Sequence, residues 1–224
     1  MNGDKPFKLV ILISGSGSNL QALIDAIACG QLDVQIVGVI SNRSSAAGLV
    51  RAKCSNIPTR IIDHNHFDDR NKYDNSLAET VKSYSPDLVV LAGFMRILGP
   101  RFVDRFIGRL INIHPSLLPK HPGLNTHQRA LDAGDLETGA TVHFVTSELD
   151  SGPAIVQASV PIKTKDCADT IAKRVLKIEH IIVPIATQWL AEGRVEMRGK
   201  NAIFDGIALP PCGKLVATET GGLN

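Results

Sequence analysis

The sequence lacks an excess of charge of either sign. Lys and Arg total 24 and Asp and Glu total 22, so the net charge is +2 over 224 residues. Proteins that bind nucleic acid or anionic membranes through charge carry a strongly basic face or tail. The balance in this sequence gives no such electrostatic footprint, so we expect no nucleic-acid partner.

A long nonpolar run and an N-terminal leader are also missing. The longest nonpolar run, Leu88–Met95 with its glycine included, is far shorter than the ~20 residues that a membrane-spanning helix needs. Met1 leads directly toward a strand-like segment, without the basic, apolar and small-residue regions of a secretory signal. We therefore expect a cytoplasmic protein that does not bind membranes.

Cysteine is scarce and has no recognisable spacing. The sequence has no C-x-x-C pair, which excludes the usual zinc and redox motifs. His64 and His66 form an H-x-H pair without further ligands nearby, so we expect no metal. In a chain able to bury a large core, the cysteines are expected to be reduced and mostly packed. They are Cys29, Cys54, Cys167 and Cys212.

What is present is the composition of an ordinary globular protein. Nonpolar residues make up 44% and charged residues 21%, which excludes disorder for the bulk of the chain. The length is close to the upper end for one domain, and no repeat, low-complexity tract or linker interrupts it. We expect a single domain over residues 1–211 and a loose C-terminal tail over residues 212–224.

Short nonpolar runs alternate with helical patterns over the first two thirds of the chain. This alternation predicts an α/β fold with a mostly parallel twisted sheet, helices on both faces and a Rossmann-like N-terminal half. The runs are almost wholly nonpolar, as in strands that are buried on both sides. The predicted strands are Lys8–Ile13, Val34–Ile40, Thr59–Ile62, Leu88–Ala92 and Leu110–His114, and the predicted helices are Ser18–Cys29, Ala46–Ser55, Phe67–Tyr84 and Gly99–Phe106.

The pattern changes after His114. Three prolines and a glycine predict a loop over Pro115–Gly123. Nonpolar residues at steps of 3 and 4 then predict one long helix over Ala168–Ala191. The other predicted elements are a helix at His127–Ala133, strands at Ala140–Val145 and Ala154–Ile162, and a hairpin of Val195–Met197 with Ala202–Phe204.

A turn of small residues, Ser14–Leu20, joins the first strand to the first helix. Such a turn directs backbone N–H groups and the positive end of the helix dipole at one point, which suits a single phosphate, and Ser18 or Asn19 could cap the helix. The third glycine of a dinucleotide fingerprint is replaced by Leu20, and no Gly-Lys-Ser/Thr of a Walker loop follows. A plain capped turn remains the alternative.

Two polar residues share one face at the end of the fifth predicted strand. Asn112 and His114 are two residues apart, so they point to the same side. An amide donor beside an imidazole suits acyl-type chemistry, in which one group stabilises an oxyanion and the other moves a proton. The alternative is a pair of buried polar residues with no catalytic role.

Asp150 follows a later strand, in a Leu-Asp-Ser-Gly turn. A carboxylate can orient a nearby imidazole and stabilise its charged form. The alternative is a turn residue whose side chain forms an Asx hydrogen bond within its own turn. The remaining histidines are interpreted as surface, loop or packed residues; they are His121, His127, His143 and His180.

Several long motifs resemble the formyltransferase family, and the resemblance runs from about residue 7 to Pro211 with the motifs in order. It is closest to the members that formylate glycinamide ribonucleotide in purine biosynthesis. The motifs are Ser14–Leu20, Ala92–Leu98, Asn112–Pro119, Gly139–Val145 and Leu149–Pro153.

The resemblance implies a role for each matching residue. Asn112, His114 and Asp150 would be the catalytic trio. Glycinamide ribonucleotide would be held by Gly17, Ser18, Asn19, Leu176, Lys177, Ile178 and Glu179. The pocket for 10-formyltetrahydrofolate, the formyl donor, would be lined by Arg70, Met95, Arg96, Ile97, Leu98, Asn112, Thr146, Ser147, Glu148, Leu149 and Asp150.

Alternatives stay open for some of these residues and for the function. Met95, Ile97 and Leu98 could be ordinary core residues, and Glu179 could lie on a solvated helix edge. A tRNA-formylating enzyme would need a further domain and a basic surface. A hydrolase of formyltetrahydrofolate would carry an additional N-terminal domain, and a non-catalytic nucleotide-binding domain would need a better fingerprint. We expect a formyl transferase that acts on small molecules as a monomer or weak homodimer.

Overall fold

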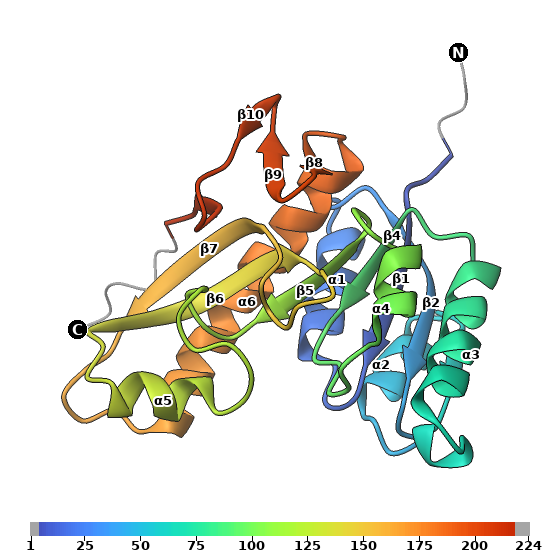
Figure 1. Cartoon of the computed structure of the whole chain (residues 1–224), viewed down its shortest axis with the longest axis horizontal. Helices are drawn as coiled ribbons and strands as arrows, with labels where there is room; N and C mark the ends of the chain where they lie inside the picture. The colour runs from blue at the N-terminus through green and yellow to red at the C-terminus, as the bar shows by residue number, and fades with distance from the viewer. Residues whose placement is uncertain (1–4, 218–224) are drawn as a thin grey trace. The chain divides into compact units, whose positions relative to one another are not determined.

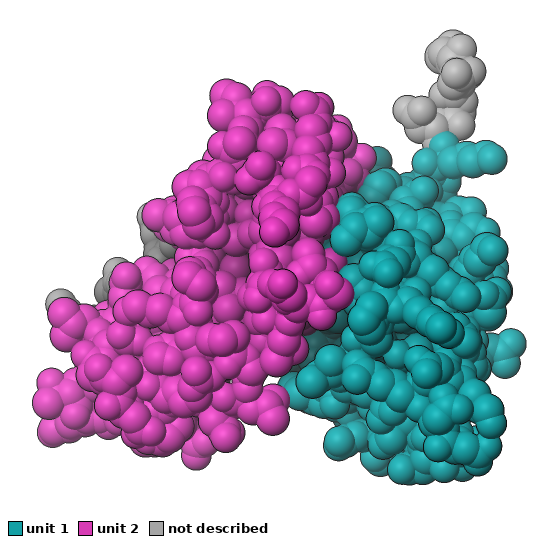
Figure 2. All heavy atoms as spheres, viewed as in Figure 1, with its two compact units in different colours: residues 1–111 teal, residues 112–224 magenta. Residues whose placement is uncertain are grey.

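The computed structural model describes residues 5–217 of the chain. The chain divides into two compact units, residues 1–111 and residues 112–224, which Figure 2 shows in different colours. The fifth strand, β5 (Leu110–His114), crosses the boundary between them. That residues 1–211 act as one domain stays a prediction.

The first unit is a parallel α/β layer structure (Figure 1). Its strands lie in the order β4-β1-β2-β3, and every neighbouring pair is parallel. Leu9 to Ile13 are all fully buried although successive side chains point to opposite faces, so both faces of β1 are covered. The elements are β1 (Lys8–Ile13), α1 (Ser18–Ala28), β2 (Gln35–Ser41), α2 (Gly48–Cys54), β3 (Thr59–Ile61), a 3₁₀ turn η1 (His64–His66), α3 (Arg70–Ser83), β4 (Leu88–Leu91) and α4 (Pro100–Arg105).

The second unit combines a mixed sheet, the longest helix and a small separate sheet. The mixed sheet has the order β11-β7-β6-β5, in which β6 and β7 are antiparallel and β11 is parallel to β7. The separate sheet has the order β10-β9-β8 and is antiparallel. The elements after β5 are α5 (Thr126–Asp132), β6 (Glu137–Phe144), β7 (Ala154–Pro161), α6 (Ala168–Ala191), β8 (Val195–Arg198), β9 (Asn201–Phe204), β10 (Ile207–Ala208) and β11 (Lys214–Leu215).

Helix α6 has the range predicted from its nonpolar spacing and packs against β6 and β7. Ile171, Val175, Ile178 and Ile182 form one fully buried stripe along it. The N-cap of α6 is Cys167, whose backbone N–H donates a hydrogen bond to the Thr170 hydroxyl. The helix therefore gives the second unit a rigid core element.

The predicted fold class is confirmed, and most predicted elements begin and end within a few residues of the observed ones. One difference lies in the segment predicted to be a loose tail. Lys214 and Leu215 pair with Val156 and Gln157 of β7, because the edge of β7 leaves backbone groups available for one more strand. Residues 218–224 of that predicted tail lie outside the described residues.

The prediction that the cysteines are mostly packed is wrong. All four are free thiols, and Cys29, Cys54 and Cys167 are exposed while Cys212 is half-buried. The three exposed ones lie at helix ends rather than on the nonpolar helix faces. Within residues 5–217, no helix is long and nonpolar enough to cross a membrane.

Candidate active site

Asn112 and His114 lie side by side on one face of β5, as their spacing predicts. The other residues of this strand, Leu110, Ile111 and Ile113, are buried and anchor it. His114 is itself buried, with 6% of its surface exposed, and Asn112 is half-buried. The strand therefore presents two polar side chains from a rigid nonpolar base.

Asp150 lies in the turn between β6 and β7 and adopts a left-handed backbone conformation, with φ of 49°. Two residues later, a Cβ on Gly152 would lie 1.8 Å from the carbonyl oxygen of Phe144, so only glycine fits there. The Oδ2 atom of Asp150 accepts a hydrogen bond of 2.8 Å from the backbone N–H of Gly123. This carboxylate thus bonds to a different loop instead of forming an Asx hydrogen bond in its own turn.

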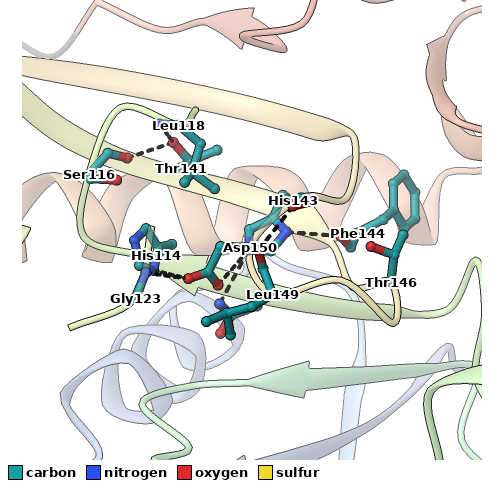
Figure 3. Close-up of polar contacts among 12 residues, drawn as sticks. His114, Ser116, Leu118, Gly123, Thr141, His143, Phe144, Thr146, Leu149 and Asp150 are labelled. Carbon is teal, nitrogen blue, oxygen red and sulfur yellow. Dashed lines mark hydrogen bonds and ion pairs between the residues drawn. The ribbon is translucent and has the colours of Figure 1, made fainter. Parts of the chain in front are cut away.

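The carboxylate of Asp150 lies between two imidazole rings, as Figure 3 shows. Its Oδ2 atom is 3.5 Å from Nδ1 of His114. The other ring nitrogen of His114, Nε2, donates a hydrogen bond of 3.0 Å to the carbonyl oxygen of His121. Both ring nitrogens of His114 therefore face oxygen atoms that can accept a hydrogen bond, which fixes the orientation of the ring.

The loop that supplies the His121 carbonyl is held by an ion pair. Asp135 accepts hydrogen bonds from Nε2 of His121 at 2.7 Å and from Nζ of Lys120 at 2.8 Å. These two bonds lower the pKa of the Asp135 carboxyl below its usual range. The Ser116 hydroxyl also donates to the Lys120 carbonyl at 2.7 Å. The partner of His114 is therefore fixed by side chains outside the trio.

A buried polar network holds the start of the same loop. Thr141 on β6 donates to the Ser116 carbonyl at 2.7 Å and accepts from the Leu118 backbone N–H at 3.1 Å. The side-chain amide of Gln157 on β7 donates to the Leu118 carbonyl at 2.6 Å. Figure 3 shows Thr141 between the two loop residues that it bonds.

Sequence reasoning missed His143, which was interpreted as a packed or surface residue. Nε2 of His143 is 3.2 Å from Nδ2 of Asn112 and 3.8 Å from Oδ1 of Asp150. Burial lowers the pKa of His143 to about 4, against the opposing effects of the Phe144 carbonyl and the Asp150 carboxylate. The available signal was a histidine next to the last residue of the nonpolar strand that leads to Asp150.

His127 on α5 is a second histidine that the sequence reasoning set aside. Burial, assisted by the positive potential of His114, lowers the pKa of His127. The imidazole of His127 therefore belongs to the electrostatic surroundings of His114.

In the first unit, the small-residue turn has the predicted place before α1, but the predicted cap is wrong. Gly17 is the N-cap, with φ of 68°, and the cap has no side-chain hydrogen bond, because Ser18 and Asn19 already lie inside the helix. A Cβ on Gly17 would lie 2.5 Å from the Cα of Gly48, so α1 and α2 approach closely at two glycines. The N-terminus of α1 therefore directs the positive end of its dipole at this turn, which suits an anion.

A cation that the sequence reasoning did not single out lies beside this turn. The Nε atom of Arg51 donates to the Ser16 carbonyl at 2.9 Å, and its Nη1 atom donates to the Oε1 atom of Gln21 at 3.2 Å. The guanidinium thus adds positive charge next to the N-terminus of α1, which suits an anionic group.

The predicted folate-binding residues of the first unit lie on α3 and on the loop after β4. The structure brings Arg70 and Ile97 together, since the guanidinium of Arg70 donates to the Ile97 carbonyl at 2.7 Å. Met95 and Ile97 are 65% and 62% exposed, so neither is a core residue, whereas Leu98 is buried. The Arg96 guanidinium stacks over the ring of Tyr73, with 4.6 Å from Cζ to the ring centre.

The predicted binding residues of the second unit lie on α6 and on the turn before Asp150. Glu179 is buried, so it is not on a solvated helix edge, and Ile178 belongs to the core stripe of α6. Leu176 is half-buried and Lys177 is exposed. In the turn, Thr146 is half-buried, and the exposed residues are Ser147, Glu148 and Leu149.

Among residues 5–217, no group of three or more His, Cys, Asp and Glu side chains is placed to hold a metal ion. The arrangement around Asp150 instead combines an amide, a carboxylate and two imidazoles with different hydrogen-bond partners. Such a group can donate hydrogen bonds to a developing oxyanion and transfer a proton.

Comparisons with known proteins agree with this chemistry. The sequence profile of the formyl transferase family matches residues 7–187. A phosphoribosylglycinamide formyltransferase of Escherichia coli (strain K12) is 51% identical over 205 residues, which are 92% of this chain and 97% of that protein. The solved structure of a phosphoribosylglycinamide formyltransferase from Coxiella burnetii, in complex with CHES, has a TM-score of 0.91 at 49% identity and covers 94% of this chain and 99% of that chain.

The fold extends to a protein whose name gives a different reaction. A formyltetrahydrofolate deformylase from Pseudomonas syringae pv. tomato has a TM-score of 0.82 at 27% identity, and the match covers 89% of this chain and 66% of that chain. The fold by itself therefore does not separate transfer to an amine from transfer to water.

Proposed function

Because the chain belongs to the formyl transferase family, we propose that it transfers the formyl group of 10-formyltetrahydrofolate to the amine of glycinamide ribonucleotide. The products are the N-formyl ribonucleotide and tetrahydrofolate, and the reaction is a step of de novo purine (IMP) biosynthesis. The donor is a cosubstrate that is consumed, and no metal takes part.

The arrangement of Asn112, His114 and Asp150 in the second unit carries this proposal. An amide donor and an imidazole share one strand face, and a carboxylate lies 3.5 Å from the imidazole. Formyl transfer needs a donor to the oxyanion of a tetrahedral intermediate and a proton for the leaving nitrogen. These three side chains supply both.

The reaction begins when the neutral amine attacks the formyl carbon. A carbon–nitrogen bond forms and the carbonyl electron pair moves onto oxygen, which gives a tetrahedral intermediate with an oxyanion. Asn112 donates a hydrogen bond to that oxygen, and His114 beside it stabilises the developing negative charge. Binding the two substrates side by side contributes to the rate by proximity.

The intermediate collapses when the bond from carbon to the folate nitrogen N10 breaks. That nitrogen leaves with the bonding electron pair and takes up a proton, while the attacking amine gives one up. Asp150 holds His114 in place and organises this proton transfer, with water as a carrier. No covalent bond to the protein forms.

Recognition of the acceptor separates this reaction from hydrolysis. Gly17, Ser18 and Asn19 hold the phosphate of glycinamide ribonucleotide, supported by the positive dipole end at the N-terminus of α1 and by the charge of Arg51. Glu179, with Leu176, Lys177 and Ile178, contacts the rest of that substrate. A hydrolase has no use for a phosphate site, because its second substrate is water.

The donor is held by residues of different chemistry. Arg70 pairs with the anionic glutamyl tail of the folate. Met95 and Ile97 offer exposed nonpolar surface to the flat pterin, together with Arg96 and Leu98. The turn Thr146–Asp150 contributes backbone groups. The protein acts in the cytoplasm on small molecules, as a monomer or weak homodimer.

The test is to mix 10-formyltetrahydrofolate with the protein and to follow the release of tetrahydrofolate. We expect slow release alone, rapid release with glycinamide ribonucleotide, and one formylated product for each folate consumed. Shortened acceptors without the phosphate should lose rate as well as affinity. Rapid release without the acceptor, unchanged when it is added, would instead indicate a deformylase and overturn the proposal.

A further inference from the structure

His143 has a defined proton position because of its backbone contact. Its Nδ1 atom is 2.8 Å from the carbonyl oxygen of Phe144. A carbonyl oxygen can only accept, so Nδ1 carries a hydrogen. In the neutral ring, the other nitrogen, Nε2, then has a lone pair and acts as an acceptor.

The ring stays neutral near pH 7. It is 2% exposed, and burial lowers the pKa of His143 to about 4. Asp150 favours the charged ring and His114 disfavours it, but burial has the largest effect. Nε2 is therefore an acceptor under the conditions in which the enzyme works.

This acceptor faces the side-chain amide of Asn112. The distance from Nε2 of His143 to Nδ2 of Asn112 is 3.2 Å, so an N–H of Asn112 donates to the ring. If the amide rotated by half a turn, its oxygen would face the lone pair of Nε2, and two acceptors would repel each other. His143 thus selects one of two amide orientations that differ little in shape.

The sheet places the ring where it can do this. The pairing of β6 with β7 shifts between Val142 and His143, and such irregularities re-aim side chains next to active sites. Figure 3 shows His143 on the opposite side of Asp150 from His114. The two imidazoles therefore lie next to different oxygens of one carboxylate and have different hydrogen-bond partners.

We propose that His143 is a positioning residue that keeps an N–H of Asn112, rather than its oxygen, available to the oxyanion of the tetrahedral intermediate. The inference rests on the proposed formyl transfer, since it gives that reaction's oxyanion donor its orientation. His143 itself does not touch the reacting atoms.

Three substitutions distinguish the role of the Nε2 acceptor of His143 from the roles of Nδ1 and of the ring shape. His143→Gln can place an amide oxygen near the position of Nε2, so the acceptor is kept. His143→Asn can keep the bond to the Phe144 carbonyl but does not reach Asn112. His143→Phe keeps the ring shape and removes both nitrogens. Thermal unfolding of each variant checks that it is folded before its kinetics are compared.

We expect kcat to fall about 10²–10³-fold in His143→Phe and His143→Asn, the usual effect of losing one oxyanion donor. The KM of each substrate should change less than about threefold, because the interaction forms in the transition state. His143→Gln should recover most of the lost kcat. Equal losses in all three folded variants, or losses in KM alone, would overturn the proposal.

A double-mutant cycle then tests whether His143 acts through Asn112. In an Asn112→Ala background, His143→Phe should cost less than about twofold, because there is no amide left to orient. In an Asp150→Asn background it should cost nearly its full effect. If His143→Phe lowers kcat fully in the Asn112→Ala background, or has no effect only in the Asp150→Asn background, then His143 acts through Asp150. Either result would refute the proposed role.

Failure of this inference is distinguishable from failure of the proposed function. The wild-type protein is first assayed with and without glycinamide ribonucleotide. The rate of each variant in the double-mutant cycle is then divided by the wild-type rate, measured with whichever acceptor, glycinamide ribonucleotide or water, the wild type uses. A protein that releases formate to water would refute the transferase, while the cycle would still report on the Asn112 amide.

Discussion

The carboxylate of Asp150 serves three groups at once. It accepts a hydrogen bond from Gly123, lies 3.5 Å from Nδ1 of His114 and lies 3.8 Å from Nε2 of His143. Because His143 faces it with a lone pair, the negative charge is directed mainly at His114. One residue in a left-handed conformation thus places its carboxylate against a backbone N–H and two imidazole rings.

Asp150→Asn should reduce kcat by about 10²–10⁴-fold, the range associated with losing assistance to proton transfer. The amide oxygen can still accept from Gly123, so the turn and the KM values should change little. Steady-state kinetics with both substrates, from pH 6 to 9, measures the effect. Near wild-type turnover across that range would remove Asp150 from the mechanism.

Asp132→Asn is the matched control for this substitution. Asp132 is an exposed carboxylate on α5 that accepts a hydrogen bond from Gln128 on the same helix. The same change of charge at this position should leave kcat unchanged.

At the scale of elements, the N-terminus of α1 is shaped by two glycines. Gly17 has a positive φ, and a Cβ there would lie 2.5 Å from the Cα of Gly48. A bulky residue at position 17 would therefore disturb the packing of α1 against α2 as well as any bound phosphate. Ser18, half-buried in the first turn of α1, is the better position for a test.

Ser18→Asp should weaken the binding of glycinamide ribonucleotide while leaving the protein folded. The added carboxylate would repel the phosphate but interact favourably with the helix dipole, so thermal stability should be equal or slightly higher. We expect the KM for glycinamide ribonucleotide to rise about tenfold or more, and the KM for the folate to stay the same. Kinetics and thermal unfolding together measure this.

Ser18→Ala provides the control, because it removes the hydroxyl without adding charge. Its effect on the KM for glycinamide ribonucleotide should be much smaller than that of Ser18→Asp. If both variants bind the ribonucleotide as tightly as the wild type, the phosphate does not lie at this helix end.

The elements that the sequence predicts well are those with a strong local signal. α6 is an example, because Ile171, Val175 and Ile178 mark its buried face by spacing alone. The cap of α1 was mispredicted because its position depends on the close approach of Gly17 to Gly48, which is a contact between two helices. β11 was missed because two residues form a strand only when the edge of β7 is beside them.

The candidate site shows the same limit. Asn112 and His114 could be paired from their spacing, since a strand places alternate residues on one face. The contact between Asn112 and His143 joins residues 31 positions apart, and the proton position of His143 depends on a backbone carbonyl. Neither the contact nor the ring's burial leaves a local pattern in the sequence.

For the whole molecule, burial of the neutral His143 makes the free energy of unfolding depend on pH. The pKa of His143 is about 4 in the folded protein and about 6.5 when exposed. Between these values the unfolded chain binds a proton that the folded chain does not, so stability falls as pH falls. At about 1.4 kcal/mol per pH unit, this one group contributes at most about 3–4 kcal/mol.

We therefore expect the free energy of unfolding to fall between pH 6.5 and pH 4, and to fall less steeply in His143→Gln, which has no imidazole to titrate. Urea unfolding at half-unit steps of pH measures how the free energy of unfolding depends on pH in each protein. All other titratable groups are common to both proteins, so the difference between the two slopes reports on His143. The predicted single domain also requires one unfolding transition. Parallel slopes in the two proteins would contradict a depressed pKa at His143.

The position of β5 across the boundary between the units has an evolutionary consequence. Asn112, His114 and Asp150 all lie in residues 112–150, whereas the turn at Gly17–Asn19 and Arg70 lie in residues 1–111. The gene segment that encodes these three residues is therefore distinct from the one that encodes the proposed phosphate turn and Arg70. A lineage could exchange one formyl acceptor for another by substitutions upstream of residue 112 and in α6, and inherit the reaction unchanged.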